Sequence, residues 1–151
     1  MRKLITICLF LSLISIVFAG EETLKGKGTL SAQGNGVVKI KGAGQIEISG
    51  DGVLWIVDCS PDEDLQIQIS GSGHKSENMP SYVNLYKGFD GHALIAGSAL
   101  KLLLTGKDIT LNASGKGRVF LKGVGTFQKG NQIGTWSEQG EGTIIEVHES
   151  E

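Results

Sequence analysis

The sequence predicts an all-β fold of short antiparallel strands, and two observations lead to that prediction. The first is a run of four octads from residue 26 to residue 57, each of which opens with a Gly-x-Gly triplet. The second is an alternation within this run, in which even positions are apolar or glycine and odd positions are mostly polar. Successive side chains of a strand point to opposite faces, so this alternation is typical of half-buried β-strands. The three- and four-residue apolar spacing of a helix is absent.

The Gly-x-Gly triplets are interpreted as hairpin loops between these strands. A three-residue loop keeps the same parity on the same face, and glycine supplies the positive φ that such loops need. The strands are predicted at residues 29–33, 37–41, 45–49 and 53–58, as an antiparallel meander that forms a sandwich or a barrel. One alternative is a parallel β-solenoid built from two-sided rungs. The other has long strands that run through the glycines and bend or bulge there.

The rest of the chain repeats this pattern less regularly. An acidic loop with a proline follows residue 57, and residues 128–142 are predicted to form a polar loop around Trp136. Further strands are predicted at residues 65–69, 82–86, 92–96, 97–106 and 143–147. A second octad array covers residues 109–127, with Gly-x-Gly triplets at the same eight-residue spacing. The two arrays, 26–57 and 109–127, are interpreted as related parts of one domain, residues 20–151.

The first nineteen residues have the three parts of a secretory signal peptide. A basic start at Arg2 and Lys3 precedes an apolar run from Leu4 to Phe18, and Ala19 suits the cleavage position. The run is shorter than the ~20 apolar residues of a membrane span. We therefore expect residues 1–19 to be removed and the mature chain, which has no second apolar run, to be exported to the periplasm or the extracellular space.

One cysteine remains after this cleavage, because Cys8 lies within the apolar run. A single cysteine in an exported protein is a buried thiol, an intermolecular bridge or a reactive group. Cys59 follows the apolar end of a predicted strand, so it is interpreted as a small buried side chain.

Charge and motif spacing argue against several classes of function. The chain has a net charge of −2, and no basic patch is interleaved with aromatic residues, so nucleic acid is not an expected partner. The Gly-x-Gly triplets lack the third glycine of a dinucleotide fingerprint. Neither the three histidines nor the acidic cluster at residues 58–64 has metal-site spacing. No cofactor, metal or enzymatic activity is expected, and an enzyme would need a cleft that unites His92 with a carboxylate.

Four aromatic residues are the candidate ligand-binding residues: Trp55, Tyr82, Tyr86 and Trp136. Trp55 lies at an outward position of the last octad, which is apolar on both of its faces. Two interpretations of this outer face remain. Either the chain covers it, with the segment after Asp58 as the nearest cover, or it is a platform for a sugar or a protein partner.

The segment LQIQISGSG (residues 65–73), the signal peptide and the repeated Gly-x-Gly strands together resemble secreted glycine-rich β-repeat proteins. The nearest such family is the adhesin-head-like "GIN" domains of bacterial envelopes. This resemblance implies a solenoidal fold and an envelope or adhesion role, and it transfers no site residues. The expected function is an exported, non-catalytic envelope or surface module, structural or interacting, with an envelope protein or glycan as partner. The alternative is a small carbohydrate-binding module that uses exposed aromatic residues.

Overall fold

The computed structural model describes residues 28–140 and 142–148, and this part of the chain is all-β, as predicted. The predicted signal peptide, residues 1–19, lies outside the described residues. The strands are β1 (Thr29–Asp58), β2 (Gln66–Lys75), β3 (Val83–Lys129), β4 (Gln132–Thr135) and β5 (Thr143–Val147). All pairings between these strands are antiparallel, and the sheet does not close into a barrel.

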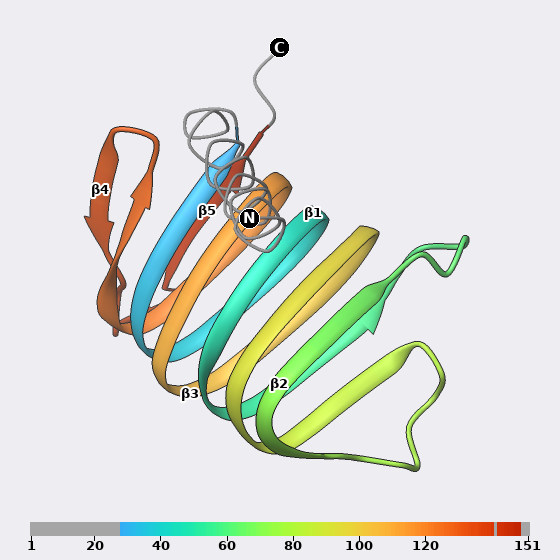
Figure 1. Cartoon of the computed structure of the whole chain (residues 1–151). Helices are drawn as coiled ribbons and strands as arrows, with labels where there is room; N and C mark the ends of the chain where they lie inside the picture. The colour runs from blue at the N-terminus through green and yellow to red at the C-terminus, as the bar shows by residue number, and fades with distance from the viewer. Residues whose placement is uncertain (1–27, 141, 149–151) are drawn as a thin grey trace, which may run out of the picture.

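The two longest strands, β1 and β3, bend repeatedly and wind around each other in opposite directions (Figure 1). Each straight segment of β1, here called an arm, pairs with a different part of β3 on each side. Ile40, for example, lies opposite Leu102 on one side and opposite Val119 on the other. Arms of β1 therefore alternate with arms of β3, and the two strands form one interleaved coil.

The Gly-x-Gly triplets are bends within strands, so the prediction that they are hairpin loops was wrong. The predicted arms at residues 29–33, 37–41, 45–49 and 53–58 all form, but they belong to β1 and pair with β3 instead of with one another. The structure has the alternative in which strands run through the glycines. The parallel β-solenoid alternative was wrong, because the pairings between the named strands are antiparallel.

The bends require glycine because glycine lies opposite glycine on the neighbouring strand. Gly36 is paired with Gly123, and Gly44 is paired with Gly115, all at φ between +135° and +137°. A Cβ atom added at Gly44 would overlap the carbonyl oxygen of Ser114. The residue at each of these positions must accept a positive φ and leave room for the partner backbone, and only glycine does both.

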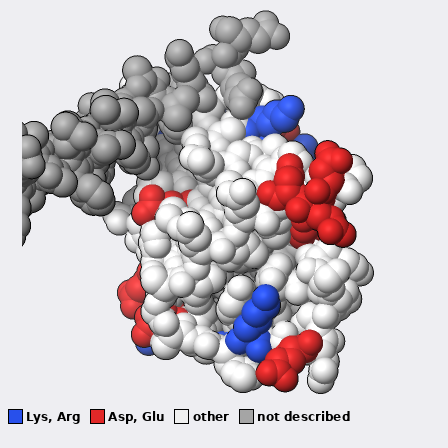
Figure 2. All heavy atoms as spheres, turned by 45° about the vertical axis from the view of Figure 1, so that its right-hand side comes forward, with Lys and Arg blue, Asp and Glu red and all other residues white. Residues whose placement is uncertain are grey.

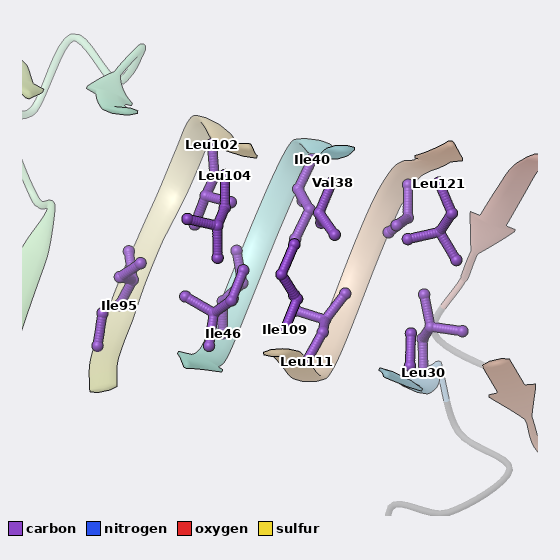
Figure 3. Packing of buried hydrophobic residues seen from close by; sticks show 14 of the residues in the cluster. Leu30, Val38, Ile40, Ile46, Ile95, Leu102, Leu104, Ile109, Leu111 and Leu121 are labelled. Atoms are coloured by element: carbon purple, nitrogen blue, oxygen red, sulfur yellow. The ribbon is translucent and has the colours of Figure 1, made fainter. Parts of the chain in front are cut away.

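The bends fold the sheet into two layers with the hydrophobic core between them (Figure 1). The first layer contains residues 29–34, 45–50, 66–71, 91–96, 109–114 and 126–129, and β4. The second layer contains residues 37–42, 53–58, 83–87, 100–105 and 117–122, and β5. Figure 3 shows the facing side chains, with Ile95, Ile46, Ile109, Leu111 and Leu30 of the first layer opposite Leu102, Leu104, Ile40, Val38 and Leu121 of the second.

Some bends of β3 contain one extra residue. Gly34 and Gly36 of β1 are opposed by Ile109 and Gly106, so three steps along β3 match two along β1. The extra residue is accommodated by Asp108, which has a φ of 53° and whose N–H donates to Oδ1 of Asn35 at 2.8 Å. This bulge shifts the inward positions of β3 from even numbers, as in Leu104, to odd numbers, as in Ile109.

The remaining segments differ from the predictions at three places. β2 continues beyond residue 69, where the predicted strand ended, as far as Lys75. Residues 128–142 include the β4 hairpin and bury Trp136, so they are not only a polar loop. Cys59 is exposed, so the prediction of a buried thiol was wrong. The closing strand at residues 143–147 is confirmed as β5.

Candidate binding face

The molecule has two outer faces with different chemistry. The outer face of the first layer, here called the polar face, presents mainly neutral side chains: Ser31, Gln33, Ser49, Gln68, Ser70, Thr110, Asn112 and Thr126. Its charged pair is His92 and Glu47, whose Nε2 and Oε1 atoms are 2.7 Å apart. The outer face of the second layer, here called the basic face, combines apolar and cationic side chains. Figure 2 brings the side with β2 forward and shows a broad uncharged surface between charged clusters.

An apolar row crosses the basic face from strand to strand. Phe120, Leu103, Trp55 and Leu85 occupy outward positions on neighbouring strands, with Lys39 between the first two. The Lys39 ammonium lies 5.2 Å from the centroid of the Phe120 ring, within the range of a cation–π contact. Leu85 is 6% exposed. It does not belong to the core cluster between the layers, in agreement with its outward position.

A cationic row lies beside the apolar row. Lys41 is paired with Arg118 on one side and with Lys101 on the other, and all three side chains are exposed. Like charges in directly opposed positions destabilise a sheet by roughly 0.2–1 kcal/mol per pair. Glu146 is the carboxylate within reach, because its Oε1 lies 3.0 Å from Nη2 of Arg118. The hydrogen bond from Arg118 holds the pKa of Glu146 below its usual value.

The two rows enclose a shallow groove of about 420 Å³. Trp55, Val57, Leu103 and Phe120 contribute apolar side chains to its lining, and Lys39, Lys41, Lys101 and Arg118 contribute the cations. This volume is within the range of small-molecule sites, which are mostly apolar with a few polar groups that fix orientation. The groove can therefore accept an apolar group beside an anionic one.

The four predicted aromatic residues do not come together on one surface. Trp55 is partly buried and lines the groove, whereas Tyr86 is opposite Leu54 and packs against the core, where desolvation raises its pKa. Tyr82 is 55% exposed at the start of the second-layer arm. Trp136 is 5% exposed, and its indole N–H donates to the carbonyl oxygen of Thr126 at 3.0 Å. Of the four residues, Trp55 is the one that lines the groove.

The segment after Asp58, which was the nearest candidate cover for Trp55, contributes no residue to the lining of the groove. This segment follows the bend at residues 97–99 instead. The Cys59 N–H donates to the carbonyl oxygen of Ala99 at 2.9 Å, and the Ser98 N–H donates to Oδ1 of Asp64 at 3.1 Å. The hydrogen bonds from Ser98 also lower the pKa of Asp64. Trp55 itself is partly exposed and lines the groove.

Sequence reasoning missed most of the groove residues. Phe120, Leu103 and Lys39 were assigned only to strands, although each occupies an outward position there. A usable signal was present in residues 101–105 and 117–122. Outward positions are mostly polar elsewhere in the sequence, but these two segments have apolar residues there, as the last octad has Trp55. The neighbours of these arms were not predictable, because the pairing partners of β1 are distant in sequence, and even the nearest pair, Val57 and Val83, is 26 residues apart.

An enzyme was expected to need a cleft that unites His92 with a carboxylate. His92 contacts a carboxylate, that of Glu47, but the pair is on an outer sheet face and not in a cleft. Within residues 28–140 and 142–148, no three His, Cys, Asp or Glu side chains form a group that could hold a metal ion. No helix capable of crossing a membrane is found in the same part of the chain.

No protein-family model, curated protein or solved structure matches this chain.

Proposed function

We propose that this protein is an exported, non-catalytic interaction module of a cell envelope or surface, and that it binds through the basic face. The observation that carries this proposal is the groove, in which Trp55 and Leu103 lie beside the cations Lys41 and Lys101. Exposed apolar surface of this kind marks binding sites, because a soluble protein normally hides it. The opposed cations are a second cost to the isolated fold that a bound anion would remove.

The non-catalytic part of the proposal is supported by the side chains that line the groove. The groove is lined by four cations and by apolar side chains, and its lining contains no serine, cysteine, histidine or carboxylate. General acid–base chemistry needs a titrating group that reaches the substrate. His92, which is the histidine closest to a carboxylate, lies on the opposite layer.

Export is supported by the sequence of residues 1–19. The mature protein is expected to begin at Gly20, and N-terminal sequencing of the protein recovered from outside the cytoplasm measures this directly. A chain that begins at Met1 there would contradict cleavage.

The interaction can be tested by co-sedimentation of residues 20–151 with cell envelopes from the organism that makes the protein. Leu103→Asp places a carboxylate in the groove and should abolish co-sedimentation. Leu94→Asp is the matched control, because Leu94 occupies an outward position of the polar face and is 43% exposed. Circular dichroism should show that both variants are folded. Equal co-sedimentation of the two variants would place the interaction elsewhere.

A second candidate is a carbohydrate-binding module that uses the polar face. Its support is the row of hydroxyl and amide groups on neighbouring strands, such as Thr126, Gln33, Thr110 and Ser49, which are paired in register. Such groups stand at the strand spacing of ~4.8 Å and can donate and accept hydrogen bonds. Gln33→Ala combined with Thr110→Ala should then weaken glycan binding and leave envelope binding through the basic face unchanged.

A further inference from the structure

We infer that the groove of the basic face binds a single anionic amphiphile, with its acidic group on the cationic row and its apolar body along the apolar row. This inference rests on the proposed function and adds the chemical class of the ligand. Three observations carry it: the order of side chains on neighbouring arms, the imbalance of charge, and the partial burial of the apolar side chains.

The order of side chains matches a ligand with a charged end and an apolar body. The cations Arg118, Lys41 and Lys101 lie at paired positions on three neighbouring arms. The next outward positions of the same three arms hold Phe120, Lys39 and Leu103. Trp55 extends the apolar row to a fourth arm. Three strand spacings separate Phe120 from Trp55, or ~14 Å, which is the length of a medium acyl chain.

The charge balance favours an anion. The groove is lined by four cationic side chains and by no carboxylate. Glu146 is next to the groove and contacts Arg118, so it offsets one of these charges. Lys41 and Lys101 have no carboxylate partner within 4.0 Å among the described residues. A phosphate or carboxylate placed between them would receive charge-assisted hydrogen bonds, which are roughly twice as strong as neutral ones.

The partial burial of the apolar side chains favours a single molecule over a bilayer surface. Leu103, Phe120 and Trp55 are only partly exposed and are surrounded by longer, exposed lysine and arginine side chains. Residues that insert into a bilayer must extend beyond their neighbours, and these do not. A chain that lies in the groove, in contrast, contacts the apolar row along its length while the cations remain in water.

Titration of residues 20–151 with dodecyl phosphate below its critical micelle concentration tests this inference, with calorimetry as the readout. Inorganic phosphate is the probe for the head group alone, and dodecyl maltoside is the probe for the chain alone. Dodecyl phosphate should bind at least tenfold more tightly than either. Equal binding of dodecyl phosphate and dodecyl maltoside would overturn the inference.

Variants then assign the binding to the groove. Lys41→Gln combined with Lys101→Gln should weaken dodecyl phosphate binding about tenfold or more, and Phe120→Ala should also weaken it. Lys75→Gln is the matched control on β2 and should have no effect. Glu146→Gln, at an exposed position, should strengthen binding about twofold to fivefold because it frees Arg118. Wild-type affinity in the double lysine variant would contradict the inference.

Vesicles distinguish binding to a membrane surface from binding to a single anionic amphiphile. If the protein binds phosphatidylglycerol vesicles but not monomeric dodecyl phosphate, the site recognises a membrane surface and the inference is wrong. The two proposals also fail differently. Loss of envelope binding in Leu103→Asp without any dodecyl phosphate binding would retain the proposed interaction face and reject this ligand class.

Discussion

The polar face and the basic face are built from the same backbone device but have opposite surface chemistry. Both consist of antiparallel arms that alternate between β1 and β3, and both place their even-numbered β1 residues in the core. At outward positions, however, the polar face has Ser31, Gln33 and Ser49, whereas the basic face has Lys39, Lys41 and Trp55. The coil itself therefore specifies neither surface.

This difference shows that inward and outward positions are under separate requirements. Inward residues of both layers must be apolar because they share one core, in which each layer packs against the other. Outward residues need only be compatible with the β conformation, so their side-chain chemistry can differ between the two faces. The departure from neutral polar residues at outward positions of the basic face is therefore the feature on which the proposed interaction rests.

The largest effect is expected where the two layers join, because a bend belongs to both. Gly44→Ala should lower the free energy of unfolding by about 3 kcal/mol or more, since the new methyl group overlaps the carbonyl oxygen of Ser114 at a φ of 136°. Gly88→Ala is the control: Gly88 also has a positive φ, 60°, but a Cβ atom there meets nothing within 4 Å. This variant should lose about 1 kcal/mol. Chemical denaturation measures both, and equal losses would show that strain alone sets the requirement for glycine.

A smaller effect separates the two outer faces. Trp55→Ala should cost about 1–2 kcal/mol, because Trp55 is only partly buried and a fully buried tryptophan costs about 3–5 kcal/mol. Leu94→Ala, on the polar face, should cost less than about 1 kcal/mol, since Leu94 is 43% exposed. Thermal and urea unfolding of the two variants gives the comparison. A loss of 3 kcal/mol or more at Trp55 would mean that it behaves as a core residue.

Sequence reasoning could predict the strands and the inward residues but not their connection. A hairpin loop and a bend of Gly-x-Gly both keep even positions inward, so the alternation from Gly28 to Ile56 fits either arrangement. What distinguishes them is which residues pair, and the partners of β1 lie in β3, far along the chain. The bulge at Asp108 was also hidden, because one extra residue shows only as a change of parity between Leu104 and Ile109.

The candidate site was predictable only in part for the same reason. Trp55 was identified because the last octad breaks the polar-outside rule within one continuous array. Its neighbours Leu103 and Phe120 belong to other arms of the second layer, and their proximity depends on the interleaving of the two strands. Trp136 was assigned to a polar loop as a candidate ligand-binding residue, but it is 5% exposed and belongs to the core cluster.

The cationic row allows a test in which removal of a side chain stabilises the fold. Lys41→Gln should raise the free energy of unfolding by about 0.2–0.5 kcal/mol at low salt, because Lys41 opposes both Arg118 and Lys101. The gain should fall in 1 M salt, where charges are screened over ~3 Å. Lys107→Gln is the control, because Nζ of Lys107 is 3.7 Å from Oδ2 of Asp51 and its removal should bring no gain. A destabilised Lys41→Gln variant would mean that the cations are compensated within the fold.

The smallest effect concerns the one carboxylate beside the cationic row. Arg118 donates a hydrogen bond to Glu146 and so lowers the pKa of its carboxyl group below the usual 4.5. The folded-state pKa is then lower than the unfolded-state pKa, so the stabilisation is complete above the unfolded value and is lost as the pH falls through the folded value. NMR titration of the Glu146 carboxyl carbon should give a midpoint below 4.5, and Arg118→Gln should raise it. Protonation of Glu146 also frees Arg118, so dodecyl phosphate, still a monoanion at this pH, should bind more tightly as the pH falls through this midpoint. If Arg118→Gln leaves this midpoint unchanged, Glu146 does not compete with a ligand for Arg118. The predicted pH dependence of dodecyl phosphate binding would then be wrong.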